Sequence, residues 1–290
     1  MTSEPHHPTT AASRLPTWIE LDGVVNMRDV GGLPTDDGST IARGRLIRSD
    51  NLQELPPASV RHLVDELGVT DVVDLRTYVE VAKEGDGPLV SRPEVTIHHL
   101  TLYPEESAET GIPAGERELP WHRDPHLGDT ARTVRIEARD DREGSQKHDA
   151  YWSQHYLAYL TKRPDNVVAA LRAIAGSPGA VIVHCAAGKD RTGTVIGLAL
   201  KLAGATDDAV VADFEASAQR VPQILARLAG RPAYSANLDG KTVQQQSPRA
   251  ETMRMMLDVL DRDHGGVEGW LTTQGWTSDE TALLRAKLRD

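Results

Sequence analysis

The segment from His184 to Gly193, with the sequence HCAAGKDRTG, decides the predicted fold of this chain. The apolar run Ala180–Val183 leads into it and predicts a buried strand, and the residues from Arg191 to Gly204 have the pattern of a helix. In α/β sheets a functional loop lies beyond the carboxyl end of such a strand. We therefore expect an α/β fold with this segment as its functional loop.

The loop contains the only cysteine of the chain, Cys185, and five residues separate it from Arg191. Such a loop can turn its backbone N–H groups inward, and with a helix N-terminus it attracts an anion and favours the thiolate. Arg191 can bind two phosphate oxygens at once. The pattern predicts a thiolate that attacks phosphorus and forms a phosphocysteine. The alternative is an inert, buried cysteine at the end of a strand.

The other residues of the loop also have expected tasks. Gly188 permits the backbone angles of an inward-facing turn, Thr192 can donate its hydroxyl to the thiolate, and His184 orders the loop. The predicted phosphate-binding residues are Ala186, Ala187, Gly188, Lys189, Asp190 and Arg191.

Together with this loop, two further segments carry a family resemblance: 26–32, NMRDVGG, and 43–50, RGRLIRSD. The strand end Asp74-Leu75-Arg76 also fits. The chain resembles the cysteine-based protein tyrosine phosphatases, and within them the atypical bacterial group similar to mycobacterial protein tyrosine phosphatase B. The resemblance extends from Trp18 to Trp270, but residues 103–148 have no match.

The resemblance implies a central, mostly parallel sheet flanked by helices, with a helical lid or insertion over the active site. Residues Val221–Gln245 are the first candidate for that lid, and residues 103–148 are the second. It also implies a phosphomonoester hydrolase acting on phosphotyrosine, on phosphoserine or phosphothreonine, and on phosphoinositides. Lys189 is then either a second cation that favours substrates with several phosphates or a solvated loop charge.

Two other functions use similar loops. A phosphate-recognising module without turnover would keep the loop and lack a working proton donor. Rhodaneses and arsenate reductases also use cysteine loops, but they usually need a different loop or partner thiols, and this chain has one cysteine.

The general acid is less clear than the nucleophile, because the chain has no Trp-Pro-Asp tripeptide. Its closest imitation, Trp121–Pro125, contains Asp124. The resemblance instead assigns the role to Asp190, and repulsion from bound phosphate would favour its protonated form. Asp29 and Asp74 are further candidates, although each is explained more simply as orienting an arginine or a loop backbone.

Composition limits the possible partners. A formal net charge of −11 argues against nucleic acid as a partner, and a single cysteine excludes an intramolecular disulfide and suits a reducing compartment. The N-terminal sequence lacks the pattern of a signal peptide and no apolar run reaches membrane-spanning length, so we expect a cytoplasmic monomer, with unconventional secretion still open. We expect no cofactor and no metal, since His122 and His126 have no third ligand nearby.

The domain organisation follows from these segments. We expect a flexible tail at residues 1–16 and one phosphatase domain at residues 17–290 with a polar surface insertion at residues 103–148. The remaining expected elements are a helix at Ala58–Leu67, strands at Val69–Leu75 and Val95–Leu102, helices from His148 and over Asp165–Ala175, and helix caps at Thr206 and at Thr277 with Glu280.

Overall fold

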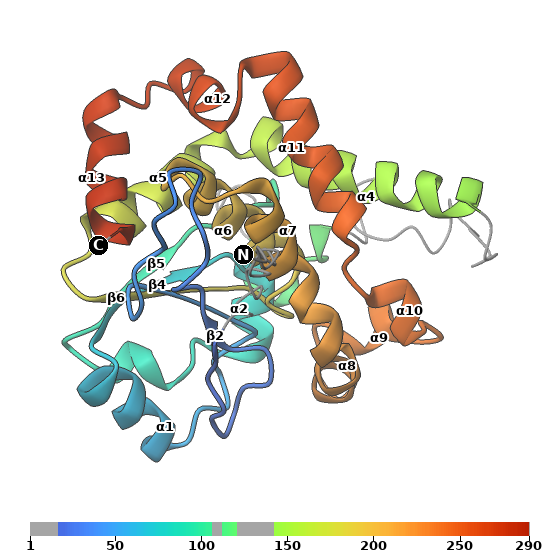
Figure 1. Ribbon diagram of the computed structural model, residues 1–290. Helices are drawn as coiled ribbons and strands as arrows, with labels where there is room; N and C mark the ends of the chain where they lie inside the picture. The colour runs from blue at the N-terminus through green and yellow to red at the C-terminus, as the bar shows by residue number, and fades with distance from the viewer. Residues whose placement is uncertain (1–16, 106–111, 121–141, 290) are drawn as a thin grey trace, which may run out of the picture.

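The sheet at the centre of the molecule has six strands (Figure 1); the computed structural model describes residues 17–105, 112–120 and 142–289. The strand order is β1-β2-β3-β6-β4-β5. Strands β3, β6, β4 and β5 pair in parallel, while β1 and β2 extend the sheet in the antiparallel sense. The strands are β1 Thr17–Trp18, β2 Arg28–Asp29, β3 Leu46–Ser49, β4 Val69–Asp74, β5 Thr96–His99 and β6 Ala180–His184. The prediction of a mostly parallel sheet is confirmed.

Helices cover both faces of this sheet, with α11, α12 and α13 above it and α1 below it in Figure 1. The α-helices are α1 Pro57–Arg61, α2 Tyr78–Glu84, α4 Arg142–Lys162, α5 Pro164–Gly176, α6 Asp190–Leu202, α7 Asp207–Ala216, α8 Val221–Ala229, α9 Ser235–Leu238, α10 Val243–Gln246, α11 Ala250–His264, α12 Val267–Thr273 and α13 Ser278–Leu288. Shorter helical segments are the π-helix His62–Glu66 and the 3₁₀ segments Pro88–Ser91, Ala114–Glu116 and Ser217–Arg220.

Alternation along the strands divides the core into two clusters, because successive strand side chains point to opposite faces. Val181 and Val183 of β6 pack in the larger cluster, with residues of α4 to α7 and α11 to α13. Ile182, between them, packs in the smaller cluster with residues of α1 and the π-helix that follows it. Because β6 is buried on both faces, it holds the start of the loop that follows it in a fixed position.

Strand β6 lies between β3 and β4, and every residue of it is buried. It ends at His184, and α6 begins at Asp190. The predicted loop therefore lies at the carboxyl end of a central strand, as the sequence pattern indicated.

The local signals for helix ends mostly agree with the structure. The side chain of Thr206 accepts a hydrogen bond from the backbone of Ala209 and caps α7, and Thr277 forms a capping box with Glu280 at α13. The helix predicted at 58–67 is interrupted: α1 ends at Arg61 and a π-helical turn completes the segment.

In the polar segment 103–148, the described residues 112–118 are exposed or half-buried, as expected for a surface insertion, but not all of the segment lies at the surface. Tyr103 and Leu119 are buried in the larger core cluster, and α4 already begins at Arg142. The prediction is therefore wrong at these two positions, where burial of an apolar side chain stabilises the core. The expected tail at 1–16 lies outside the described residues, among which no helix has the length and apolar character needed to cross a membrane.

Candidate active site

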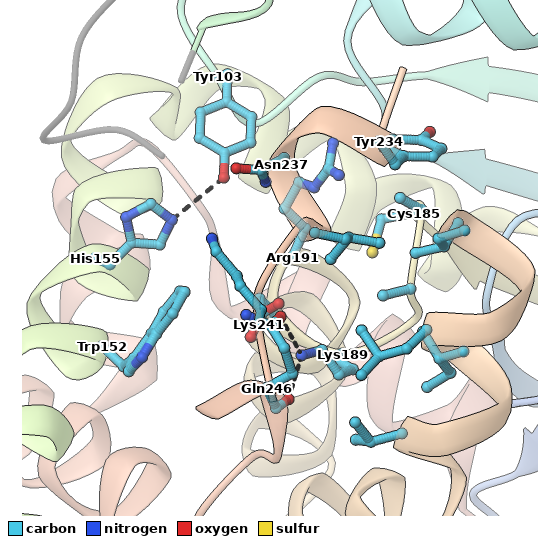
Figure 2. A pocket seen from close by; sticks show the side chains of 18 of the residues that line it. Tyr103, Trp152, His155, Cys185, Lys189, Arg191, Tyr234, Asn237, Lys241 and Gln246 are labelled. Atoms are coloured by element: carbon cyan, nitrogen blue, oxygen red, sulfur yellow. Dashed lines mark hydrogen bonds between the residues drawn. The ribbon is translucent and has the colours of Figure 1, made fainter. Parts of the chain in front are cut away.

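A pocket of about 120 Å³ opens where the loop leaves β6 (Figure 2). Cys185 and Arg191 line it together, although each residue is less than a tenth exposed. In Figure 2 Trp152 and His155 lie across the pocket from Cys185. A pocket wall is not where an inert core thiol is expected, so the placement of Cys185 favours the functional alternative. The other lining residues are Tyr103, Tyr159, Ala186, Ala187, Lys189, Asp190, Val221, Ile224, Leu225, Leu228, Tyr234, Asn237, Leu238, Lys241 and Gln246.

The loop carbonyl groups are hydrogen-bonded from behind. The backbone N–H of Asn51 donates to the Ala186 carbonyl at 3.1 Å, and the Asn26 side-chain amide donates to the Ala187 carbonyl at 2.9 Å. The Arg48 guanidinium donates to the Gly188 carbonyl at 2.7 Å. None of the backbone N–H groups from Ala186 to Lys189 donates to another described residue. Fixing the carbonyls on the outside in this way leaves the N–H groups available to an anion.

Gly188 has a left-handed backbone, with φ of +66°, as expected for the turn of such a loop. A Cβ atom built there would come within 2.5 Å of the Ser49 carbonyl oxygen. Both the backbone angle and the close approach exclude a larger residue at this position, so the prediction for Gly188 is confirmed.

A buried ion cluster supports the loop from beneath. Asp213 on α7 accepts hydrogen bonds from Arg28 at 2.9 Å and from Arg48, and all three side chains are buried. Burial alone would raise the pKa of Asp213, but the two guanidinium groups outweigh burial and hold that pKa below its ordinary value. For Arg28 the effect of burial prevails, and it lowers the pKa of this guanidinium to about 10. The cluster therefore ties the segment 26–48 to α7 through charges that stay paired at neutral pH.

Glu80 fixes the position of Arg191. Its two carboxylate oxygens accept hydrogen bonds from the two terminal nitrogens of Arg191 at 2.6 and 2.9 Å. The Tyr103 ring lies 5.3 Å from the Arg191 guanidinium carbon and adds a cation–π contact. Burial would lower the pKa of Arg191, but the charge of Glu80 outweighs it, so the guanidinium stays charged at the pocket wall.

Asp190 and Lys189, the two charged residues inside the loop, each have a partner. Asp190 lines the pocket, and its Oδ1 accepts a hydrogen bond of 2.6 Å from the Tyr156 hydroxyl. The Lys189 ammonium donates to the backbone carbonyl of Gln246 at the end of α10. Lys189 is 6% exposed and bound to the last residue of α10, so the prediction of a solvated loop charge is wrong.

The four supporting residues are placed differently. Asp74 orients Arg76, with hydrogen bonds as short as 2.6 Å, and Asp29 accepts from the backbone of Gly31 and Gly44 at 2.9 Å; neither aspartate lines the pocket. His184 lies 3.6 Å from Asp74 and contacts the Cys185 carbonyl, so it orders the loop as predicted. Burial lowers its pKa to about 4 and keeps it neutral.

The prediction for Thr192 is not met. Its buried hydroxyl has no hydrogen-bond partner among the described residues, Cys185 included.

The outer wall of the pocket comes from α8, α9 and the segment that follows them. Ile224, Leu225 and Leu228 of α8 present an apolar surface to the pocket, and Lys241 and Gln246 add polar groups beside it. Helices α8 to α10 coincide with the segment Val221–Gln245, the first candidate for a lid, except that α10 ends one residue later, at Gln246. The structure thus places a helical segment over the site, as the resemblance implied.

Two predictions fall on residues 121–141, outside the described part of the chain: Asp124 as an alternative acid, and the histidines 122 and 126. Within the described ranges, no three His, Cys, Asp or Glu side chains gather closely enough to hold a metal ion.

The sequence matches the model of a tyrosine phosphatase family over residues 19–290. This chain belongs to the tyrosine phosphatase family. A triple specificity protein phosphatase, PtpB of Mycobacterium tuberculosis, is 31% identical to it over 93% of this chain and 98% of its own length. A putative tyrosine-protein phosphatase of Cupriavidus necator is 27% identical over 92% of this chain and 87% of its own. A tyrosine-protein phosphatase of Nostoc commune is 33% identical over 40% of this chain and 42% of its own.

As a member of the tyrosine phosphatase family, the protein is a cysteine-based phosphatase acting on phosphorylated substrates. Sequence reasoning missed the residues that hold the phosphatase site in place: Asn26, Arg48, Glu80, Tyr156 and Asp213. Asn26 and Arg48 lie in segments quoted for the resemblance, and Thr77 with Glu80 is a capping-box pattern. None of these signals shows which loop atom the side chain reaches.

Proposed function

We propose that the protein hydrolyses phosphomonoesters through a phosphocysteine formed on Cys185. The observation that carries this proposal is a thiol beside loop N–H groups that have no other partner among the described residues, with Arg191 on the same pocket wall. The N–H groups from Ala186 to Asp190 and the guanidinium would bind the three equatorial phosphate oxygens. These oxygens carry charge throughout the transfer, so fixed donors lower the barrier without reorganising.

Asp190 is our proposed general acid. Its carboxyl group lines the pocket beside the cysteine loop, within the same ten-residue segment. As the Cys185 sulfur bonds to phosphorus and the ester P–O bond breaks, Asp190 gives its proton to the leaving oxygen. In the second step the carboxylate takes a proton from the water that attacks the phosphocysteine, which frees the thiolate and phosphate.

The proposed substrates are phosphotyrosine, phosphoserine or phosphothreonine, and phosphoinositides. Lys189 and Lys241 both line the pocket, so a second phosphate group would meet cations there. The apolar wall on α8 suits an aromatic ring or an acyl chain. The printed name of the Mycobacterium relative, a triple specificity phosphatase, agrees with such breadth. We further propose a cytoplasmic monomer, because a nucleophilic thiol without a partner cysteine needs reducing surroundings.

The chemistry is tested with Cys185→Ser and Arg191→Ala on p-nitrophenyl phosphate. The serine variant should lose turnover and keep phosphate binding, measured by titration calorimetry. The alanine variant should lose both. Substantial turnover by the serine variant would reject the phosphocysteine.

The acid and the substrate class need a second experiment. Asp190→Asn should reduce kcat about 100-fold on an alkyl phosphate and much less on p-nitrophenyl phosphate, whose leaving group needs little protonation. An equal loss on both would reduce Asp190 to a structural role. A panel of phosphopeptides and phosphoinositides, assayed on the unaltered protein, would rank the substrates.

A further inference from the structure

A tyrosine outside the phosphate pocket is hydrogen-bonded to Asp190. The Tyr156 hydroxyl donates to Asp190 Oδ1 at 2.6 Å, and Tyr156 is 2% exposed. Tyr156 comes from the C-terminal half of α4, whereas Asp190 is the first residue of α6, so this bond joins two distant parts of the chain. Its length is that of a strong O–H to carboxylate bond.

The two oxygens of Asp190 differ in their surroundings. Oδ1 accepts the bond from Tyr156, and Oδ2 accepts no hydrogen bond from any other residue in the described ranges. Tyr156 does not line the phosphate pocket; it lines a separate hollow of about 10 Å³, which Asp190 also borders. The hydroxyl therefore reaches Asp190 from the side of that hollow, which leaves Oδ2 as the oxygen for the pocket.

Tyr156 is well suited to hold this contact. Its ring packs edge-on against Phe214 with centroids 5.8 Å apart and stacks with Tyr159 at 6.3 Å, so the side chain has little freedom. Burial, and then the negative charge of Asp190, raise the pKa of Tyr156 well above its ordinary value. The phenol consequently remains a proton donor throughout the working range of the enzyme.

We propose that Tyr156 is a positioning residue for proton transfer, which holds Asp190 so that Oδ2 delivers its proton to the leaving oxygen. This inference rests on the proposed role of Asp190 as the general acid. The O–H bond at Oδ2 breaks as the ester P–O bond breaks, and the proton ends on the leaving alcohol. Tyr156 keeps its own proton and touches no reacting atom.

Tyr156→Phe tests the proposal, because it removes the hydroxyl and keeps the ring. We expect kcat on an alkyl phosphate to fall about ten-fold and kcat on p-nitrophenyl phosphate to fall no more than about two-fold, with KM little changed on either. Tyr151→Phe on the same helix, where the side chain lines neither hollow, is the matched control and should leave both rates unchanged. Equal losses on the two substrates would overturn the proposal in favour of a structural role.

The double variant Tyr156→Phe with Asp190→Asn separates this inference from the proposed function. If Tyr156 acts through Asp190, the tyrosine change should add no further loss once Asp190→Asn is already present. An additive loss would overturn the positioning role. If Asp190→Asn alone lowers both substrates equally, the proposed acid fails; if it discriminates and Tyr156→Phe does not, only the inference about Tyr156 fails.

Discussion

The two sides of the pocket are built from different materials. The loop side is polar and buried: Asn26, Arg48 and Asn51 bind its carbonyls and Asp213 pairs the arginines. The α8–α10 side presents apolar side chains to the pocket, and its Arg227 and Arg231 share an exposed partner on the body, Glu54, at 3.0 and 2.5 Å. Partly exposed pairs contribute little, whereas breaking a buried pair is costly. We therefore expect the loop side to be the more rigid wall of the pocket.

The largest effect should come from breaking the buried cluster. Arg48→Met removes a partner of Asp213 and the donor to the Gly188 carbonyl. We expect about 3–5 kcal/mol loss in the free energy of unfolding, measured in urea, and at least a 100-fold loss in kcat/KM. Glu54→Gln, which removes the exposed partner of Arg227 and Arg231 on the helical side, should cost about 1 kcal/mol or less. Similar losses for the two variants would erase the contrast between the two sides.

Lowering the pH should reduce the folding stability of the loop side through protonation of His184. Burial, with help from Arg76 and Arg191, lowers its folded pKa to about 4 from the ordinary 6.5, against the pull of Asp74. The unfolded chain therefore binds this proton first as the pH falls, so folding stability drops from about pH 6.5 to pH 4, by up to roughly 3 kcal/mol. Urea unfolding of His184→Asn should show a shallower decline over that window. A slope equal to that of the unaltered protein would contradict the assignment.

Gly188→Ala should distort the loop without removing any polar group. The left-handed backbone and the 2.5 Å approach to Ser49 resist a Cβ atom. We expect about 2 kcal/mol loss of stability and at least ten-fold weaker phosphate binding by calorimetry. Gly230→Ala on the helical side is the control, since a Cβ atom there meets nothing within 4 Å. Unchanged phosphate affinity in Gly188→Ala would show that phosphate binding by the loop does not need the left-handed backbone at this position.

The smallest effect should come from removing the hydrogen bond by which Lys189 joins the loop side of the pocket to the α8–α10 side. Lys189→Met removes the bond to the Gln246 carbonyl, worth about 1 kcal/mol. Hydrogen exchange should become faster in α8–α10, while kcat on p-nitrophenyl phosphate should change less than about three-fold. Unchanged exchange in these helices would mean that other contacts hold them.

The sequence was informative wherever a local pattern determines the structure. The strand before Cys185, the left-handed turn at Gly188 and the cap at Thr277 each depend on a few neighbouring residues. It failed where a partner is remote: Glu80 reads as a capping residue, and nothing local shows that its carboxylate also binds Arg191.

Lys189 illustrates the same limit. Its charge suggested either solvent or substrate, but its ammonium group binds the carbonyl of Gln246 at the end of α10, far along the sequence. Thr192 shows the opposite error, since its place in the loop segment suggested a hydrogen bond to the thiolate, whereas its buried hydroxyl has no hydrogen-bond partner among the described residues. Side-chain partners across the fold require the coordinates of both partners.

The hydrogen bond from Asn26 to Gly188 spans 162 positions of sequence, and that from Arg48 spans 140. The phosphate-binding loop 185–191 therefore takes its shape only after these remote segments have met. Such contacts form late if contacts between near neighbours in the sequence form first. Only the fully folded protein then binds an oxyanion. A phosphate mimic such as vanadate would therefore raise the melting temperature of the whole protein when it binds in the pocket.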